Sequence, residues 1–289
     1  MNQPFKSAVT MQVEELLSKY AAGERDFREA NLVGVNLAGK TLCQINLRGA
    51  NLRGANLHGI DLSSANLRET TLASADLSQA TLIETNLIGA DLSEAKLCKA
   101  DLSEAGLRGA KLTHANLSHA ILLEANLGEA SLIRANLSEA NLGEASLIRA
   151  KLIEADLTKA ILESANLTNA ILSAAILESA NLTNAILHGT NLEEADLREA
   201  DISRAKLTGA ILTNAVLSRI SGRSANFCWT SLRGVNLHKA NLYKAKFSWA
   251  NLSEANLTEA VLINASLNQA NLHNAKLTGA ILPNGVTYA

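Results

Sequence analysis

Aromatic side chains are scarce in this chain. Only 3% of its 289 residues are Phe, Trp or Tyr, whereas 47% are hydrophobic and most of these are Ala or Leu. An ordinary globular core takes much of its buried area from aromatic and β-branched side chains, so the composition excludes a core of that kind. It predicts instead an interior built by repetition of one small unit.

Long apolar runs and cysteine-rich motifs are also missing. No stretch approaches the roughly 18 apolar residues of a membrane span, and MNQPFKSAVTMQVEELL at the start lacks the apolar region of a signal peptide. The three cysteines, Cys43, Cys98 and Cys228, lie far apart, which predicts free thiols in a reducing compartment. We therefore expect a cytoplasmic protein that makes no membrane contact.

Groups that carry catalysis or bind metals do not cluster in the sequence. The glycines occur singly, so no glycine-rich loop is present to hold a phosphate. His114 and His119 come nearest to a metal-binding pair, but no cysteine or third histidine accompanies them. The sequence predicts a protein that is not an enzyme and has no cofactor and no metal site.

What the chain does have is a five-residue phrase repeated almost throughout. Leu occupies every fifth position from residue 32 to residue 282 except at Ile202, Gly222, Phe227 and Phe247, and the residue two places earlier is usually Ala. Neither the helix period of 3.6 nor the strand period of 2 places such leucines on one side. A chain that turns a corner every five residues does, with Leu and Ala inside and the other three residues outside.

The repeated phrases resemble those of a known family. ANLRG at 50–54, ADLSQ at 75–79 and ANLSE at 135–139 fit the A-(D/N)-L-x-x pattern of pentapeptide-repeat proteins of cyanobacterial type. That resemblance implies an all-β fold, a right-handed quadrilateral β-helix of about 13 coils with four pentapeptides in each 20-residue coil. LLSKYAAGERDF at 16–27 resembles the N-terminal cap of a regulator of heterocyst differentiation that works by protein contact.

The open ends of such a rod are sheet edges and need covers. We predict a capping helix in residues 10–22, with Thr10 as its N-cap and Gly23 at its end. The apolar face of that helix would consist of Val13, Leu16, Leu17 and Tyr20.

The expected organisation is an N-terminal segment with the capping helix at 1–23, the β-helix at 24–282 and a tail at 283–289. Val286 and Tyr288 are expected to fold over the last coil. This arrangement favours a monomer, and an incompletely covered last coil leaves an end-to-end dimer as the alternative.

The middle of the rod contains duplicated sequence. EANLGEASLIRA occurs at 124–135 and again at 139–150, a displacement of 15 residues or three faces. Such a shift rotates each copy onto another side, so it would not reproduce a binding surface confined to one face. We interpret residues 120–190 as a spacer. The glutamates spaced by 20 are interpreted as routine outward residues rather than a site for a cation; they are Glu84, Glu104, Glu124 and Glu144.

Charge is segregated along the chain although the net charge is only −2. Between Asp101 and Asp201 there are 15 acidic and 7 basic residues, whereas residues 202–253 contain eight basic residues and no acidic one. A rod with such a dipole can steer an oppositely charged partner.

Residues 202–253 also hold five of the nine aromatic residues. Their spacing by 20 predicts that Phe227 and Phe247 stack inside the rod and that Trp229 and Trp249 stack outside. Exposed tryptophans beside basic side chains are typical of interaction hot spots, although the two could also simply pair with each other. The candidate partner-binding residues are Trp229, Trp249, Tyr243, Arg204, Arg219, Arg223, Lys239, Lys244 and Lys246.

One irregularity lies within this region, in SRISGRSANFCWTSL at 218–232. Gly222 stands where a core Leu belongs, which would leave a costly void. Ile220 stands where Ala is usual and is expected to supply the missing volume. We also expect a local bulge over Ser221–Ser224 that points Arg223 outward.

These observations favour a non-enzymatic scaffold or regulator whose partner, another protein, engages the basic aromatic part of the rod. One alternative follows from the resemblance, because some pentapeptide-repeat proteins mimic DNA and act on DNA gyrase; this chain would then act on gyrase or another DNA-binding protein. A second alternative is direct nucleic-acid binding through residues 202–253.

Overall fold

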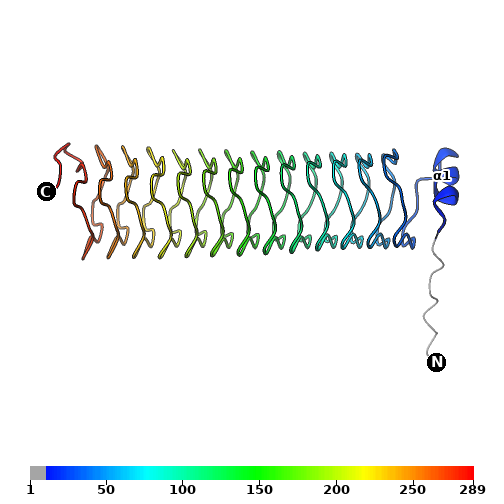
Figure 1. The fold of residues 1–289 in the computed structure, drawn as a ribbon, viewed down its shortest axis with the longest axis horizontal. Coiled ribbons are helices and arrows are strands. Elements are labelled where there is room, and N and C mark those ends of the chain that lie inside the picture. The colour runs from blue at the N-terminus through cyan, green and yellow to red at the C-terminus, as the bar shows by residue number, and fades with distance from the viewer. Residues whose placement is uncertain (1–10) are drawn as a thin grey trace, which may run out of the picture.

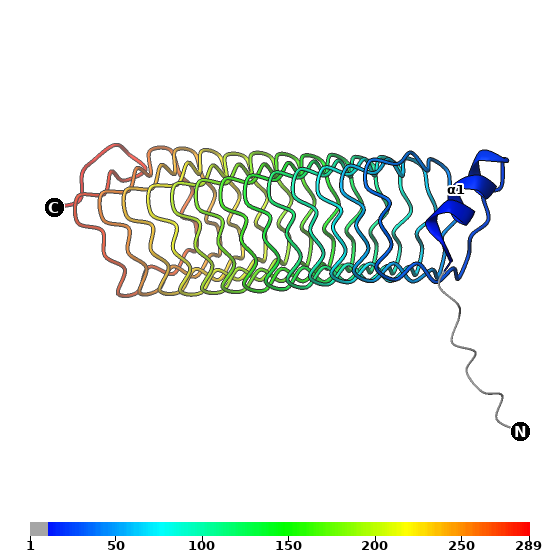
Figure 2. The same cartoon turned by 45° about the vertical axis from the view of Figure 1, so that its right-hand side comes forward.

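The computed structural model describes residues 11–289, which form a long rod of stacked coils with one helix at its N-terminal end (Figure 1). Parallel bridges join residues that are 20 apart, from Asp26 and Asn46 at one end to Val261 and Ile281 at the other. They are single bridges rather than longer strands. The chain is therefore a β-solenoid with a 20-residue coil, as the family resemblance implies, and Figure 2 shows the coils following one another along the whole rod.

The corners of the coil share one local geometry, with few exceptions. The second residue after the buried Leu has a positive φ, 58° at Glu104, and the next amide donates to the Leu carbonyl, as Ala105 does to Leu102 at 3.0 Å. These features match a type II turn. The Asp or Asn before Leu stabilises the turn by a side-chain hydrogen bond. In one corner, the Asp101 carboxylate accepts a hydrogen bond from the Ser103 amide at 3.0 Å. Each A-(D/N)-L-x-x phrase thus supplies a buried Ala and Leu and forms one corner of the coil.

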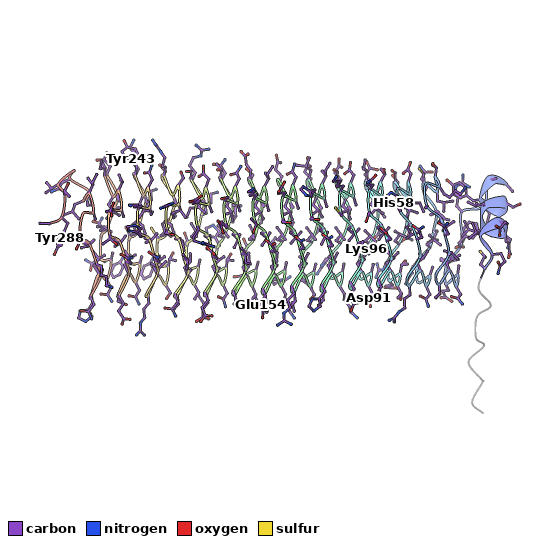
Figure 3. The ribbon with its side chains drawn as sticks, viewed as in Figure 1. His58, Asp91, Lys96, Glu154, Tyr243 and Tyr288 are labelled. Atoms are coloured by element: carbon purple, nitrogen blue, oxygen red, sulfur yellow. The ribbon has the colours of Figure 1, made fainter. Side chains whose placement is uncertain are left out.

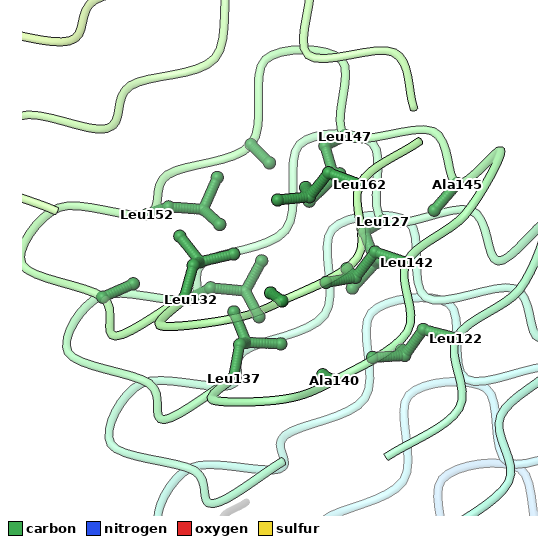
Figure 4. Close-up of a cluster of buried hydrophobic side chains, with 14 of the residues drawn as sticks. Leu122, Leu127, Leu132, Leu137, Ala140, Leu142, Ala145, Leu147, Leu152 and Leu162 are labelled. Carbon is green, nitrogen blue, oxygen red and sulfur yellow. The ribbon is translucent and has the colours of Figure 1, made fainter. Parts of the chain in front are cut away.

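The core is a stack of leucines with alanines between them (Figure 4). Leu122, Leu142 and Leu162 occupy equivalent positions in successive coils and are fully buried. Each buried Leu stabilises the fold by up to about 2 kcal/mol before ordering entropy is subtracted. Where Thr replaces the inward Ala, its hydroxyl donates to a Leu carbonyl, as Thr70 does to Leu47 at 2.9 Å.

Helix α1 (Val13–Ala21) closes the N-terminal end of the core. Leu16 is fully buried against the first coil, and Leu17 and Tyr20 pack partly against it. The Tyr20 hydroxyl also donates to the Cys43 carbonyl at 3.0 Å. None of the helical structure in residues 11–289 has the length and apolar content of a transmembrane helix.

Helix α1 ends just before Gly23, as predicted, but it is shorter than the predicted span. Gly23 has a φ of 97°, and the following Glu24 amide donates to the Lys19 carbonyl at 3.0 Å, which is the Schellman pattern of a helix C-terminus. The helix begins later than the expected span of 10–22, and Thr10 lies outside the described residues.

The C-terminal tail folds back on the last coil. Ile281 forms an antiparallel bridge with Thr287, and the Tyr288 amide donates to the Ala280 carbonyl at 2.8 Å. The side chains of Val286 and Tyr288 nevertheless remain 57% and 47% exposed. The tail therefore pairs with the backbone edge without burying the side chains that were expected to cover the coil.

Outward side chains form four long faces along the rod. In Figure 3, Tyr243 projects from the side opposite Asp91 and Glu154, while His58 and Lys96 lie between those two sides. We number the faces by the outward residues of one coil, and each face continues at every twentieth residue. The first face contains Thr41, Cys43 and Gln44; the second Asn46, Arg48 and Gly49; the third Asn51, Arg53 and Gly54; the fourth Asn56, His58 and Gly59.

Candidate functional site

The four aromatic residues spaced by 20 form two stacks, one inside the rod and one outside. The Phe227 and Phe247 rings are buried and parallel, with centroids 4.8 Å apart. The Trp229 and Trp249 rings stack on the second face with centroids 5.0 Å apart. Both stacks confirm the prediction from spacing. The tryptophans remain 62% and 53% exposed, so stacking on each other leaves much of their apolar surface in contact with solvent.

Both tryptophans occupy the positive-φ position of a corner. Their φ values are 60° and 63° for Trp229 and Trp249, whereas other corners of the same column carry Gly, Glu, Arg, Asn or Gln. A bulky side chain in this backbone region is unusual, and such strain costs on the order of 1–3 kcal/mol. The positive φ is shared with the other corners, so what distinguishes this column is the exposure of two large aromatic side chains where its other corners carry Gly or polar residues.

A cationic groove of about 460 Å³ lies on the first face. Arg204, Arg223 and Lys244 line it, with the Tyr243 ring among them. The Arg223 guanidinium carbon and the Lys244 ammonium nitrogen each lie 5.2 Å from the centre of the Tyr243 ring, within range of cation–π attraction. Arg204 Nε donates to Asn184 Oδ1 at 2.7 Å. Sequence reasoning placed these four predicted residues on one face, and the structure brings them together.

Small polar side chains complete this groove. The Ser203 and Ser221 hydroxyls share a hydrogen bond of 2.8 Å, and Ser224 lies beside them. The single carboxylate of the lining, Asp201, accepts a hydrogen bond from the Ser203 amide at 2.8 Å. Three cations beside several hydroxyl groups suit a carboxylate or phosphate group of a partner.

The structure does not bring the remaining predicted residues into this groove. Lys246 lies on the second face with the tryptophans, whereas Arg219 and Lys239 lie on the fourth face. Arg219 is 3.4 Å from the Glu199 carboxylate, and Lys239 is 3.5 Å from that of Glu259. The nine candidates thus divide among three faces, and two of them have their charge neutralised by partners outside residues 202–253.

The expected bulge near Gly222 is absent, so that prediction is wrong. The Ser221 and Ser224 amides keep their ladder hydrogen bonds at 3.0 and 2.8 Å, and Ser224 has the usual positive φ of 58°. A Cβ atom at Gly222 would lie 3.0 Å from Leu242 Cδ2 and 3.5 Å from Ile220 Cδ1. Ile220 therefore supplies the missing volume, as expected, together with Leu242.

Charge on the first face changes sign along the rod. From Asp61 to Asn184 its outward positions include no Lys, Arg or His, whereas the cations of the groove follow from Arg204 onward. Sequence reasoning missed this separation because it considered the acidic and basic stretches along the chain rather than one face at a time. The seven carboxylates of this part of the face are Asp61, Glu84, Asp101, Glu104, Glu124, Glu144 and Glu163.

Several carboxylates on the other faces lie beside cations of neighbouring coils. On the second face, Glu129 is 3.0 Å from Arg108 and 2.8 Å from Arg149. The hydrogen bond from Arg108 is the main reason that the pKa of Glu129 lies below its ordinary value. On the third face, the Arg134 hydrogen bond lowers the pKa of Glu154 in the same way.

Comparison with known proteins connects this architecture to a family. The family model described as pentapeptide repeats matches stretches that together cover residues 26–173 and 175–284. HetL from the cyanobacterium Nostoc sp. strain PCC 7120, a pentapeptide repeat protein involved in heterocyst differentiation regulation, is 35% identical over 96% of this chain and 100% of HetL, with a TM-score of 0.49.

Two further solved structures are similar at lower identity. A pentapeptide repeat protein of the Arabidopsis thaliana thylakoid lumen is 28% identical over 44% of this chain and 72% of its own, with a TM-score of 0.25. Full-length QnrB1, a plasmid-mediated fluoroquinolone resistance protein, is 19% identical over 86% of this chain and 93% of its own, with a TM-score of 0.23. A search of curated proteins gives no match.

Proposed function

The chain belongs to the pentapeptide repeat family, and on that premise we propose that it is a non-enzymatic rod that binds another protein. The surface that would bind this partner combines the tryptophan stack of the second face with the cationic groove of the first face. We call it the basic aromatic surface, and it consists of Trp229, Trp249, Lys246, Arg204, Arg223, Tyr243 and Lys244.

The observation that carries this proposal is the exposed tryptophan stack. Trp, Tyr and Arg are the residues most enriched in interaction hot spots, and Trp and Tyr contribute large contact areas with few rotatable bonds. Trp229 and Trp249 are 62% and 53% exposed at strained corners. A contact that buried both rings would exploit a surface that the fold alone does not require. A regulatory role, the role named for HetL, is the finer form of the proposal.

The test replaces both tryptophans with asparagine, the residue found at the equivalent corner at Asn169, where φ is 56°. We expect the Trp229→Asn, Trp249→Asn variant to fold and to lose capture of the protein that the parent retains from a lysate of its source cells. A matched control, Asn169→Ala with Gln269→Ala, changes the same column and should retain that protein. Equal capture by the double tryptophan variant would overturn the proposal.

Direct nucleic-acid binding by residues 202–253 receives less support from the structure. Arg219, Arg233 and Lys239 each lie beside a glutamate of a neighbouring coil. A band shift with single-stranded or duplex DNA that weakens steeply with salt would favour this function over protein binding.

Action on a DNA-binding protein stays the second candidate, favoured by the acidic stretch of the first face. The acidic stretch ends at the cationic groove of the same face, so this face does not present acidic charge along the whole rod, and this function ranks below the first. Protection of DNA gyrase in a supercoiling assay would reverse that order.

A further inference from the structure

We propose that two copies of this chain pair side by side and antiparallel through their first faces. The acidic stretch of each copy would lie against the cationic groove of the other. This inference rests on the groove of the proposed function and names a second copy as its occupant, while the tryptophan stack on the second face stays available to a different protein.

The first observation is that charge on the first face is not neutralised within one chain. Among residues 11–289, every ion pair lies in α1 or on the second, third or fourth face. Arg48 with Glu69, Arg134 with Glu154 and the pair on Arg198 are examples from those three faces. The eight carboxylates of the first face, which are the seven named above and Asp201, form none, and neither do its three cations.

The second observation is the order of charges along one corner column of that face. Glu84 to Glu144 occupy successive coils, Ser164 and Asn184 follow without charge, and Arg204 and Lys244 come after them. A two-fold axis that lies in the interface across the rod reverses this order and keeps each column opposite itself.

That operation produces complementary charges. If the axis crosses between Ser164 and Asn184, Glu144 of one copy faces Arg204 of the other, and Glu104 faces Lys244. A parallel arrangement would instead place carboxylates opposite carboxylates and cations opposite cations. Like charges in contact cost several kcal/mol, so the charge pattern selects the antiparallel arrangement.

The third observation is apolar surface within the acidic stretch. Ile121, Leu123 and Ile161 are 38%, 40% and 41% exposed on the first face. Under this axis Ile161 lies near the centre of the interface, and Ile121 and Leu123 lie opposite Ser221 and Arg223 of the other copy, so pairing would cover all three apolar side chains. The stretch from Glu84 to Lys244 extends about 40 Å at about 4.8 Å per coil, which is long enough for an interface of standard size. Part of the stretch expected to be a spacer thus acquires a role.

The test uses two complementary variants. The first carries Glu104→Lys, Glu124→Lys and Glu144→Lys, so that all charged residues of the corner column from 104 to 244 are cations. The second carries Arg204→Glu, Arg223→Glu and Lys244→Glu, so that its first face is acidic throughout. The readout is molar mass by sedimentation equilibrium at low salt, with circular dichroism to verify that each variant keeps the parent spectrum.

We expect the parent to be dimeric, each variant alone to be monomeric with a dimer dissociation constant raised at least about 100-fold, and an equimolar mixture to form a heterodimer. A matched control, Glu94→Lys with Glu194→Lys, changes the same corner position on the third face and should stay dimeric. A monomeric parent, or a mixture that does not associate, would overturn the inference. Dimers in both variants would also overturn it, because another surface would then hold the copies together.

The same measurement separates this inference from the proposed function. The Trp229→Asn, Trp249→Asn variant should stay dimeric, since its changes lie on the second face. If the dimer forms as expected while the tryptophans prove irrelevant to capture of another protein, the proposed function fails and the pairing stands.

Discussion

The middle of the rod and its 202–253 region share one interior and differ in their surfaces. Both use the same corner geometry and the same backbone ladder, and both bury one large side chain every five residues apart from Gly222. The middle presents mostly charged and small polar residues, whereas the other region presents stacked tryptophans and a cationic groove. In this fold the core sets the shape, and outward columns can change without altering it.

The largest expected effect comes from emptying the core in each region. Leu142→Ala should cost about 2–5 kcal/mol and Phe227→Ala about 3–5 kcal/mol, because both side chains are fully buried in a core that cannot collapse around the void. Urea unfolding measures both. A cost below about 1 kcal/mol for Leu142→Ala would show that the middle of the rod is loosely packed. The two regions would then not share the same interior.

A smaller effect is expected from restoring the repeat at its irregular point. Gly222→Leu should destabilise the rod by about 1–3 kcal/mol, because Ile220 and Leu242 already occupy that space. Adding Ile220→Ala should recover most of the loss, since the pair would then match the repeat elsewhere. Thermal unfolding of Gly222→Leu, Ile220→Ala and the double variant gives the coupling free energy, and additive effects would refute compensation between the two positions.

The smallest expected effect is a pH dependence of the ion pairs on the middle coils. The pKa of Glu129 is lowered in the folded state, mainly by Arg108, so its contribution is present above the unfolded pKa and is lost as pH falls through the folded one. The urea midpoint should decrease slightly on acidification from neutral pH. On the same acidification, the urea midpoint of the Glu129→Gln variant should decrease less than that of the parent. An identical decrease would show that the pair of Glu129 with Arg108 does not stabilise the rod.

The five-residue period predicted the corners, and the resemblance to pentapeptide-repeat proteins supplied the 20-residue coil from which the stacks followed. Because residues 20 apart lie in adjacent coils, the positions of Phe227, Phe247, Trp229 and Trp249 followed from their spacing. The expected bulge at Gly222 was wrong because the hydrogen-bond ladder fixes the backbone on both sides of it, which composition does not reveal.

The surface was harder to predict because its contacts cross the limits of a sequence segment. Arg219 and Lys239 belong to an acid-free stretch of sequence, yet Glu199 and Glu259 lie one coil away and neutralise them. Comparing residues 20 apart beyond 202–253 would have revealed both pairs. The separation of charge on the first face required the same comparison along the whole rod.

The 20-residue coil also governs how such a chain can change in length. An added pentapeptide preserves every buried Leu, but it advances the rest of the rod by a quarter turn relative to what precedes it. An insertion between Ser164 and Asn184 would therefore carry Arg204 and Lys244 away from the column of Glu84, while duplication of a whole coil would keep them aligned. An insertion can thus preserve the fold and still misalign the outward columns. Only insertions of whole 20-residue coils lengthen the rod and keep the residues of a binding surface on one face.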